Sequence, residues 1–517
     1  MRLATVTVLL KLARSPLGRL GVRVAALLGL LVVLVGCGHE IAAGNAKLLL
    51  QIMAVIAVAV LAFTRRGAYI GILLLAAMNG LPFFDTSRIV GAKITLEEVA
   101  IYVLIATAIV WMATAEEGFR PSRVGRAISR AGAVLFLWYV VSVARTVVEH
   151  DVPTMRAAAY GRDFAFFALL LMVLPRIQLK SRDVGALLAV LLVGVCIFAV
   201  GQIMIAVGAG HPGSLIHFEK TRVQSGLVRV YARMTDLVTI GAVMGMAASL
   251  AAPQRKVRII ALPVTLLLMV SVVVQLTRAR WVGIVVGLVV VGAWIMIKGE
   301  TPRTAALRRR VTVSVGLLAG AITTILLVAP SLISSGTAVQ RLTSLFTDLE
   351  SNGGTVAARE TATKVLKLAL GEEWPLGLGF LPPSVHFVVG LPKGSLRDAD
   401  LGVLNPVVTM GVVGAVLIYV PVILVLVHCL RALATERVGE YSWLPYGGAV
   451  WIVGALASSI TLVTLFSTSG LALTGVVLAI FTHPTVLGAR QALPATAEPP
   501  PAEPAVGFSR ALSAPYA

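Results

Sequence analysis

Charged residues are scarce in this chain, and the shortage excludes an ordinary soluble domain. Only 13% of its 517 residues are Asp, Glu, Lys or Arg, and 58% are hydrophobic, whereas a soluble domain carries about 25% charged residues. The mean hydropathy is +0.93. This composition predicts a membrane protein with many spans.

Cysteine is also rare, which argues against two further kinds of scaffold. Cys37, Cys196 and Cys429 stand singly in apolar segments, with no Cys-x-x-Cys pair. Neither a disulfide framework nor a zinc site is therefore indicated. Cys37 follows Leu-Val-Gly, as in a lipoprotein cleavage box, but the preceding leader is long for a signal peptide, which favours a plain first helix.

Acidic residues are fewer than basic ones, 24 against 44, which gives a net charge of +20. In a soluble protein this excess would suggest nucleic acid, but here it follows membrane topology, and no nucleic-acid partner is expected. Apolar runs long enough to span predict about fourteen helices, near 22–38, 46–63, 68–83, 97–114, 131–148, 163–175, 184–209, 234–251, 258–276, 281–297, 311–335, 403–428, 442–460 and 463–482.

Charge sets the expected orientation. With the N-terminus inside, every short inner loop is basic, as the positive-inside rule requires, at 64–67, 119–130, 176–182, 254–258, 298–310 and 430–437. We therefore predict a multi-pass protein of the inner (plasma) membrane with both termini cytoplasmic.

The predicted fold class is all-α, a polytopic bundle of about 12–14 transmembrane helices with one large extracytoplasmic loop that contains short helices. The expected divisions are a cytoplasmic basic arm (1–21), a transmembrane bundle with short loops (22–335) and the large loop (336–402). The C-terminal spans (403–482) and a disordered Pro-rich cytoplasmic tail (483–517) follow.

Two arginines stand against the charge rule. Arg278 and Arg280 lie in a short outer turn between apolar runs, where an arginine is unfavourable at depth. The loop 211–236 brings more cations to the same face, among them Arg229 and Arg233. Planar guanidinium forks bind phosphate oxygens bidentately, so the cluster suits a lipid diphosphate. Snorkelling to lipid phosphates is the alternative for either arginine alone.

The segment 336–402 is the one long hydrophilic excursion, and a loop of this length is usually functional. Apolar spacing predicts an amphipathic helix over 355–370 that ends at Gly371. Asp398 and Asp400 precede the next span as a site carboxylate or a simple helix cap. Further loop candidates are Arg341 and Arg359, for phosphates or a solvated face, and Trp374 and Phe380, for sugar stacking or loop anchoring.

Three stretches together resemble the O-antigen ligase/polymerase family of bacterial membrane glycosyltransferases. TRARWVG (277–283) is similar to a helix entrance with the family's arginine at Arg278. The stretch 340–380 ends in PLGLGF, like the family's Pro-Leu-x-Gly-x-Gly turn, and DLGVLNPVVTMGVVG (400–414) ends in Gly-x-x-Gly. The resemblance covers residues 220–430.

The resemblance implies a metal-independent transfer of a glycan from an undecaprenyl diphosphate carrier to an acceptor sugar hydroxyl on the outer face, without a cofactor. The donor, a glycan or glycolipid acceptor and the bilayer are then the partners, with a flippase and a chain-length regulator as further ones. Arg278 matches the family arginine that holds the diphosphate, and Arg229 resembles a second one. Arg280 and Arg233 complete the predicted diphosphate site.

One departure concerns the catalytic base. Eleven residues before Gly411, where the ligases carry a histidine, this chain has Asp400. An aspartate can still polarise the acceptor hydroxyl, so Asp400 is the first candidate, with Asp398 and His386 behind it. The change argues against a lipid A ligase and favours a polymerase or a less specialised member of the family. A flippase or exporter of lipid-linked glycan is the competing hypothesis, for which paired halves, broken helices or charges at mid-membrane are expected.

Overall fold

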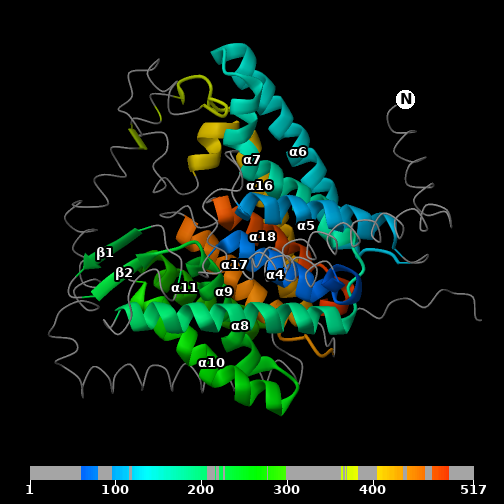
Figure 1. Ribbon diagram of the computed structural model, residues 1–517, viewed down its shortest axis with the longest axis vertical. Helices are drawn as coiled ribbons and strands as arrows, with labels where there is room; N and C mark the ends of the chain where they lie inside the picture. Colours follow the sequence, from blue (N-terminus) through cyan, green and yellow to red (C-terminus); the bar gives the residue numbers. More distant parts are fainter. Residues whose placement is uncertain are drawn as a thin grey trace, which may run out of the picture.

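The computed structural model describes residues 60–79, 96–115, 119–206, 216, 220–224, 227–275, 277–298, 363–364, 367, 370–381, 404–434, 439–459 and 468–487. Their helices form a bundle (Figure 1), with the bounds α4 Arg66–Met78, α5 Leu96–Ala113, α6 Arg123–His150, α7 Thr154–Val173, the 3-10 turn η2 Leu174–Arg176, α8 Ser181–Ala206, α9 Met234–Ala251, α10 Arg255–Val274, α11 Arg278–Lys298, α16 Leu404–Ala434, α17 Leu444–Ser459, α18 Thr468–Phe481 and α19 Pro484–Leu487.

The chain is a helical membrane protein. Seven helices in the described ranges are long and apolar enough to cross a bilayer, namely Arg123–His150, Thr154–Arg176, Ser181–Ala206, Met234–Ala251, Arg255–Val274, Ala279–Ile297 and Asn405–Ala434. Large apolar side chains also lie on the outside of the bundle, such as Val285 at 58% and Leu262 at 56% exposure. Hydrocarbon is the surrounding in which such faces are stable.

Most described helices lie where the hydropathy predicted them, and α9 occupies the predicted range 234–251. The span predicted at 163–175 starts at Thr154 instead. The additional N-terminal turns of α7 contain Arg162, whose charge lowers the hydropathy of this segment. In the folded protein Arg162 pairs with Glu98 of α5 at 2.5 Å, which neutralises that charge. The runs 22–38 and 311–335 lie outside the described residues.

α4 is almost entirely buried within the described bundle. It contacts α5 and α8 and lies in the middle of the ribbon (Figure 1). Eleven residues of this short helix are buried, Tyr69, Leu74 and Met78 among them. A helix that is apolar on all sides is stable only inside a larger structure or a membrane. α4 ends at Asn79, which has a left-handed conformation with φ 42°.

Glycines let α11 and α17 approach backbone to backbone. A Cβ on Gly283 would lie 2.6 Å from the Gly454 carbonyl oxygen, and a Cβ on Gly454 would lie 2.5 Å from the Gly283 carbonyl oxygen. Gly287, one turn further along α11, faces Val450 in the same way. Small residues four apart are typical of closely packed membrane helices.

The helix ends meet in two groups, which we name the basic end and the opposite end of the bundle. At the basic end, Arg66 of α4 donates to Gln178 O at 2.9 Å, and Ser122, the N-cap of α6, donates to Thr482 O at 2.7 Å. At the opposite end, Asn79 donates to Glu97 at 3.0 Å. The loops predicted as basic, 64–67, 119–130 and 176–182, therefore contribute to a single end.

A two-stranded hairpin is the exception to the all-α prediction. β1 (Lys220–Gln224) and β2 (Leu227–Tyr231) pair antiparallel in the segment expected to be an outer loop before α9. The register places Arg222 opposite Arg229. The alternating VRVYA pattern of this segment suits a strand, but it is short beside the apolar runs that dominate the sequence.

His483 is enclosed at the basic end, just after α18. The residue is 2% exposed, and Leu179 N donates to Nε2 at 3.1 Å. Burial lowers the pKa of His483 from 6.5 to about 4, against smaller opposing effects from the Ile177 carbonyl and Asp183. The folded protein therefore keeps this imidazole neutral at pH values at which the unfolded chain protonates it.

This burial predicts a loss of stability in mild acid. Because the folded pKa lies below the unfolded one, the unfolded state binds the extra proton between pH 6.5 and about 4. The stabilisation is complete above pH 6.5 and falls by roughly 3 kcal/mol as the pH drops through that window. Thermal melting of the detergent-solubilised protein against pH should show the decline, and His483→Gln should flatten it. An equally steep decline in His483→Gln would refute this assignment.

Candidate functional site

α16 is broken at Gly411, in its second turn. Gly411 has φ 68° and ψ −179°, a combination open essentially only to glycine. A helix break leaves N–H and C=O groups without partners, which is costly near hydrocarbon. The glycine belongs to the Gly-x-x-Gly stretch that is part of the family resemblance.

The segment 370–381, here named the docked segment, fills this break with its own backbone. Leu378 N donates to Val408 O at 2.7 Å, Val412 N donates to Trp374 O at 3.1 Å, and Val413 N donates to Pro375 O at 3.3 Å. These bonds replace the helical ones on both sides of Gly411. PLGLGF and GVVG, which lie some thirty residues apart, therefore form one structural unit.

Four residues of the helix predicted over 355–370 are described, and the rest of it lies outside the described residues. Residues 363, 364, 367 and 370 are helical, and Gly371 has φ 44°. Gly371 N donates to Lys367 O at 3.2 Å, which ends the helix in a left-handed glycine. The docked segment begins directly afterwards and packs on the bundle.

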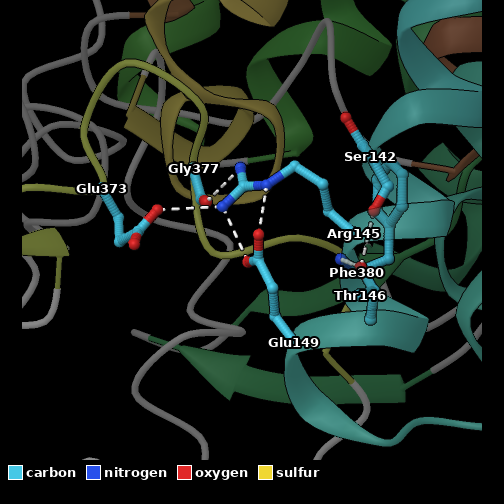
Figure 2. A network of polar contacts seen from close by, with 7 residues as sticks. All are labelled: Ser142, Arg145, Thr146, Glu149, Glu373, Gly377 and Phe380. Carbon is cyan, nitrogen blue, oxygen red and sulfur yellow. Dashed lines mark hydrogen bonds and ion pairs between the residues drawn. The ribbon is translucent and has the colours of Figure 1, made fainter.

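Arg145 of α6 holds the docked segment in place (Figure 2). Its Nε and Nη2 each lie 2.8 Å from the Glu149 carboxylate, Nη2 donates to Glu373 at 2.9 Å and Nη1 donates to Gly377 O at 3.2 Å. Arg145 thus contacts the docked segment directly, and Glu149, one turn further along α6, holds the guanidinium in position. Thr146 completes the contact by accepting from Phe380 N at 2.8 Å.

The two aromatic residues of the docked segment have different surroundings. Phe380 is 2% exposed and packs against Tyr139 and Phe164, at ring-centroid distances of 5.5 and 5.8 Å. It therefore anchors the loop. Trp374 is 55% exposed and has a face free for a sugar ring or for the membrane interface.

Arg280 makes the second polar centre, at the start of α11. Its Nη2 donates to Asp236 of α9 at 2.5 Å, and its Nη1 donates to Gln275 Oε1 at 2.7 Å. The Arg280 side chain is 15% exposed and that of Asp236 is 11% exposed. Arg280 is thus partnered by a carboxylate within a mostly enclosed site.

Several donors around Arg280 lack an acceptor within the described ranges. These are Arg280 Nε and the amide nitrogens of Gln275 and Gln202. Gln202, whose Oε1 accepts from Ser271 at 2.5 Å, extends this polar group to α8. Buried donors without partners are unfavourable, so the site suits a bound oxygen-rich group or water.

A cleft runs from Arg280 and Asp236 between α9, α11, α17 and α18. Its lining becomes apolar away from the charges, with Ile240, Val243 and Val450 among its residues, and its empty volume, part of it open to solvent, is ≈ 480 Å³. Val243 lies seven residues along α9 from Asp236, so the apolar part extends about 10 Å into the bundle. The cleft thus has a charged end at Arg280 and Asp236 and a mostly apolar lining beyond it.

Other ion pairs share the opposite end of the bundle. Arg233, just before α9, pairs with Glu97, and Arg162 pairs with Glu98. Burial lowers the pKa of Arg233 from its ordinary value because it disfavours the charged form. Two of the four arginines predicted to hold a diphosphate, Arg280 and Arg233, thus have carboxylate partners here, and an incoming anion would have to compete with these.

The remaining candidates are only partly placed. Arg278 is the first residue of α11 and Arg229 lies in β2, but their side chains lie outside the described parts. The other predicted site residues also fall outside them, namely Asp398, Asp400, His386, Arg341 and Arg359. Their roles stay predictions.

Five residues of these centres were not among the predicted site residues, namely Arg145, Glu149, Glu373, Asp236 and Gln275. Arg145 and Glu149 were readable only as a helical pair four residues apart, and nothing in the sequence linked them to Glu373. Gln275 and Asp236 flank the predicted arginines, but their pairing depends on α9, α10 and α11 meeting at one point. In the sequence, such site residues can be recognised as ionisable or amide side chains at the end of an apolar run.

Within the described residues, no group of three or more His, Cys, Asp or Glu side chains is arranged to hold a metal ion. Comparison of the chain with family models and with curated proteins finds no match.

Proposed function

We propose that the chain is a membrane glycosyltransferase that moves a glycan from an undecaprenyl diphosphate carrier to an acceptor sugar hydroxyl, as a polysaccharide polymerase or ligase. The observation that carries the proposal is the cleft at Arg280. It offers a guanidinium at the end of the bundle and a mostly apolar lining beside it, and the Gln275 side chain bonds the same guanidinium; an amphiphile with an anionic head requires such a combination.

Two further features support the proposal. The motif segments PLGLGF and GVVG, on which the family resemblance rests, meet at Gly411. In addition, the basic loops gather at one end of the bundle and the cleft residues Asp236 and Arg280 lie at the other. Under the positive-inside rule the basic end faces the cytoplasm, and the cleft then opens where a carrier delivers exported glycan.

The chemistry follows from these charges. Breaking the bond between the anomeric carbon and phosphate leaves an anionic diphosphate, so fixed guanidinium groups in an enclosed site stabilise the leaving group. Arg278 and Arg280, together with Arg229 and Arg233 from the segment before α9, are proposed to do so. Asp400 is proposed to accept the proton of the acceptor hydroxyl, with Asp398 and His386 as the next candidates.

Removal of the proposed groups should stop transfer in cells. Arg278→Ala and Asp400→Ala should each lower polymer formation by about 10²- to 10⁴-fold, with accumulation of undecaprenyl-linked glycan measured by mass spectrometry of lipid extracts. Arg278→Lys should also be impaired, because an ammonium cannot bind a phosphate bidentately. The matched control is Arg255→Ala, an exposed arginine at the basic end, which should export normal polymer. Normal polymer from both alanine variants would overturn the site.

A lipid-linked glycan flippase is the second candidate, because the break at Gly411 is a feature of transport proteins. Here the chain's own docked segment satisfies the break, which favours a fixed structure over a moving gate. The two functions differ in where the intermediate accumulates. Loss of a transferase leaves lipid-linked glycan in the outer leaflet, whereas loss of a flippase leaves it in the inner leaflet, and an impermeant sugar-oxidising reagent distinguishes the two.

A further inference from the structure

The polar centre at Arg280 has the form of a phosphate subsite already occupied by a carboxylate. Nε and Nη2 lie on the same edge of a guanidinium group, so a bidentate oxyanion bonds to both. Asp236 bonds Nη2 through Oδ1 alone. Arg280 Nε stays buried with no acceptor among the described residues. The Asp236 carboxylate therefore bonds only one of the two donors on this edge of the guanidinium group, Nη2, and leaves Nε unbonded.

Gln275, which bonds the third guanidinium nitrogen, Nη1, carries a further donor. Its Oε1 accepts from Arg280 Nη1 at 2.7 Å, which identifies the other amide atom as the NH₂ group. That nitrogen is buried without a partner in the described structure, and the residue is 1% exposed. Two unused donors from adjacent residues of one site call for an acceptor with several oxygens, which a phosphate group has and a single carboxylate contact does not provide.

We propose that Asp236 is a displaceable counter-anion, and that a phosphate group of a lipid diphosphate takes its place on Arg280 and Gln275. The identity of the ligand rests on the proposed function. Without ligand, Asp236 neutralises a mostly buried guanidinium, which would otherwise be strongly destabilising. With ligand, the phosphate oxygens bond Nη2, Nε and the Gln275 amide, and the apolar part of the cleft receives the start of the hydrocarbon chain.

Under this proposal Asp236 competes with the ligand for Arg280. A purely structural ion pair would not compete, so the two cases predict different effects of Asp236→Asn on diphosphate binding. Asp236→Asn keeps the shape of the side chain and removes the competing charge. The variant should melt at a lower temperature than the wild type when no anion is present. Inorganic diphosphate should then restore much of the loss, and should bind the variant about tenfold or more tightly than it binds the wild type.

Glu98→Gln is the matched control, because Glu98 is a buried carboxylate that pairs with an arginine, Arg162, at the same end of the bundle and does not line the cleft. It should also lower the melting temperature, but inorganic diphosphate should not restore it. Equal binding of diphosphate by the wild type and Asp236→Asn, or a destabilised Asp236→Asn that diphosphate does not restore, would overturn the proposal.

A second variant covers the case in which Asp236→Asn does not fold. Gln275→Met retains the length of the side chain and removes the amide, so it should weaken diphosphate binding about tenfold. Unchanged affinity in Gln275→Met would overturn the Gln275 part of the subsite and, with an unfolded Asp236→Asn, the whole proposal.

The source of the phosphate is tested in phosphatidylcholine nanodiscs that carry either undecaprenyl diphosphate or undecaprenol. Stabilisation of the full-length protein by the diphosphate lipid, beyond that by inorganic diphosphate, supports a lipid headgroup. If inorganic diphosphate stabilises the protein and the diphosphate lipid gives no further stabilisation, the lipid headgroup is overturned as the source of the phosphate. The subsite and the proposed function can fail separately. If the protein binds the diphosphate lipid but its Arg278→Ala and Asp400→Ala variants still export polymer, the proposed function is refuted and the subsite is retained.

Discussion

Gly411→Val should detach the docked segment from the bundle and largely abolish function. Valine is strongly disfavoured at φ 68° and ψ −179°, at about 1–3 kcal/mol for the backbone alone, and its Cβ would overlap the Pro375 carbonyl. The three backbone hydrogen bonds that join the docked segment to α16 would then be lost. We expect a total loss of stability of about 5 kcal/mol, since each buried unpaired group adds about 1–3 kcal/mol.

The effect of Gly411→Val can be measured in two ways. Thermal melting should show the loss of stability, and limited trypsin digestion should cleave at Lys364 or Lys367 faster than in the wild type, because these lysines precede the docked segment. Val413→Ala is the matched control, two residues further along α16 with a side chain 40% exposed, and should behave like the wild type. Wild-type melting and digestion of Gly411→Val would show that the break does not depend on glycine.

Gly454→Val should separate α11 from α17 and deform the cleft. A Cβ at this position would lie 2.5 Å from the Gly283 carbonyl oxygen, which belongs to rigid helical backbone that cannot move aside. Overpacking of this kind destabilises by about 3 kcal/mol, and α11 and α17 also carry cleft residues, Arg280 and Ser458 among them. We therefore expect both a lower melting temperature and loss of polymer formation.

The control for Gly454→Val is Val285→Ala on α11, because Val285 is 58% exposed on the outside of the bundle. It removes a lipid-facing group and should change melting by less than about 1 kcal/mol. If Gly454→Val melts like Val285→Ala, the backbone contact between the two helices is not tight in the membrane.

The helical spans were predictable because each depends on local composition. The predicted runs 97–114 and 258–276 correspond to α5 and α10 within three residues at each end. The early start of α7 was not predictable, since Arg162 lowers the local hydropathy and its partner Glu98 lies in another helix. The short hairpin at 220–231 was missed because its signal is weak beside the apolar runs.

The candidate site was predictable only in part. A cation such as Arg280 in a short turn between apolar runs is conspicuous in any membrane sequence. Its carboxylate partner Asp236 lies forty-four residues earlier in the chain, so the balance of charge in the site could not be read from spacing. The contact of Arg145 with Glu373 bridges 228 residues and left no sequence pattern at all.

The sequence by itself determined that this chain is a helical membrane protein, with its basic loops at alternate helix ends, because hydropathy and charge act locally on each segment. Only the tertiary structure decided how α16 breaks at Gly411, which segment satisfies the break and which carboxylate neutralises Arg280. These features arise from close approaches between distant parts of the chain. Such approaches depend on helix packing and on the need to satisfy buried polar groups, and neither is encoded in any single stretch of residues.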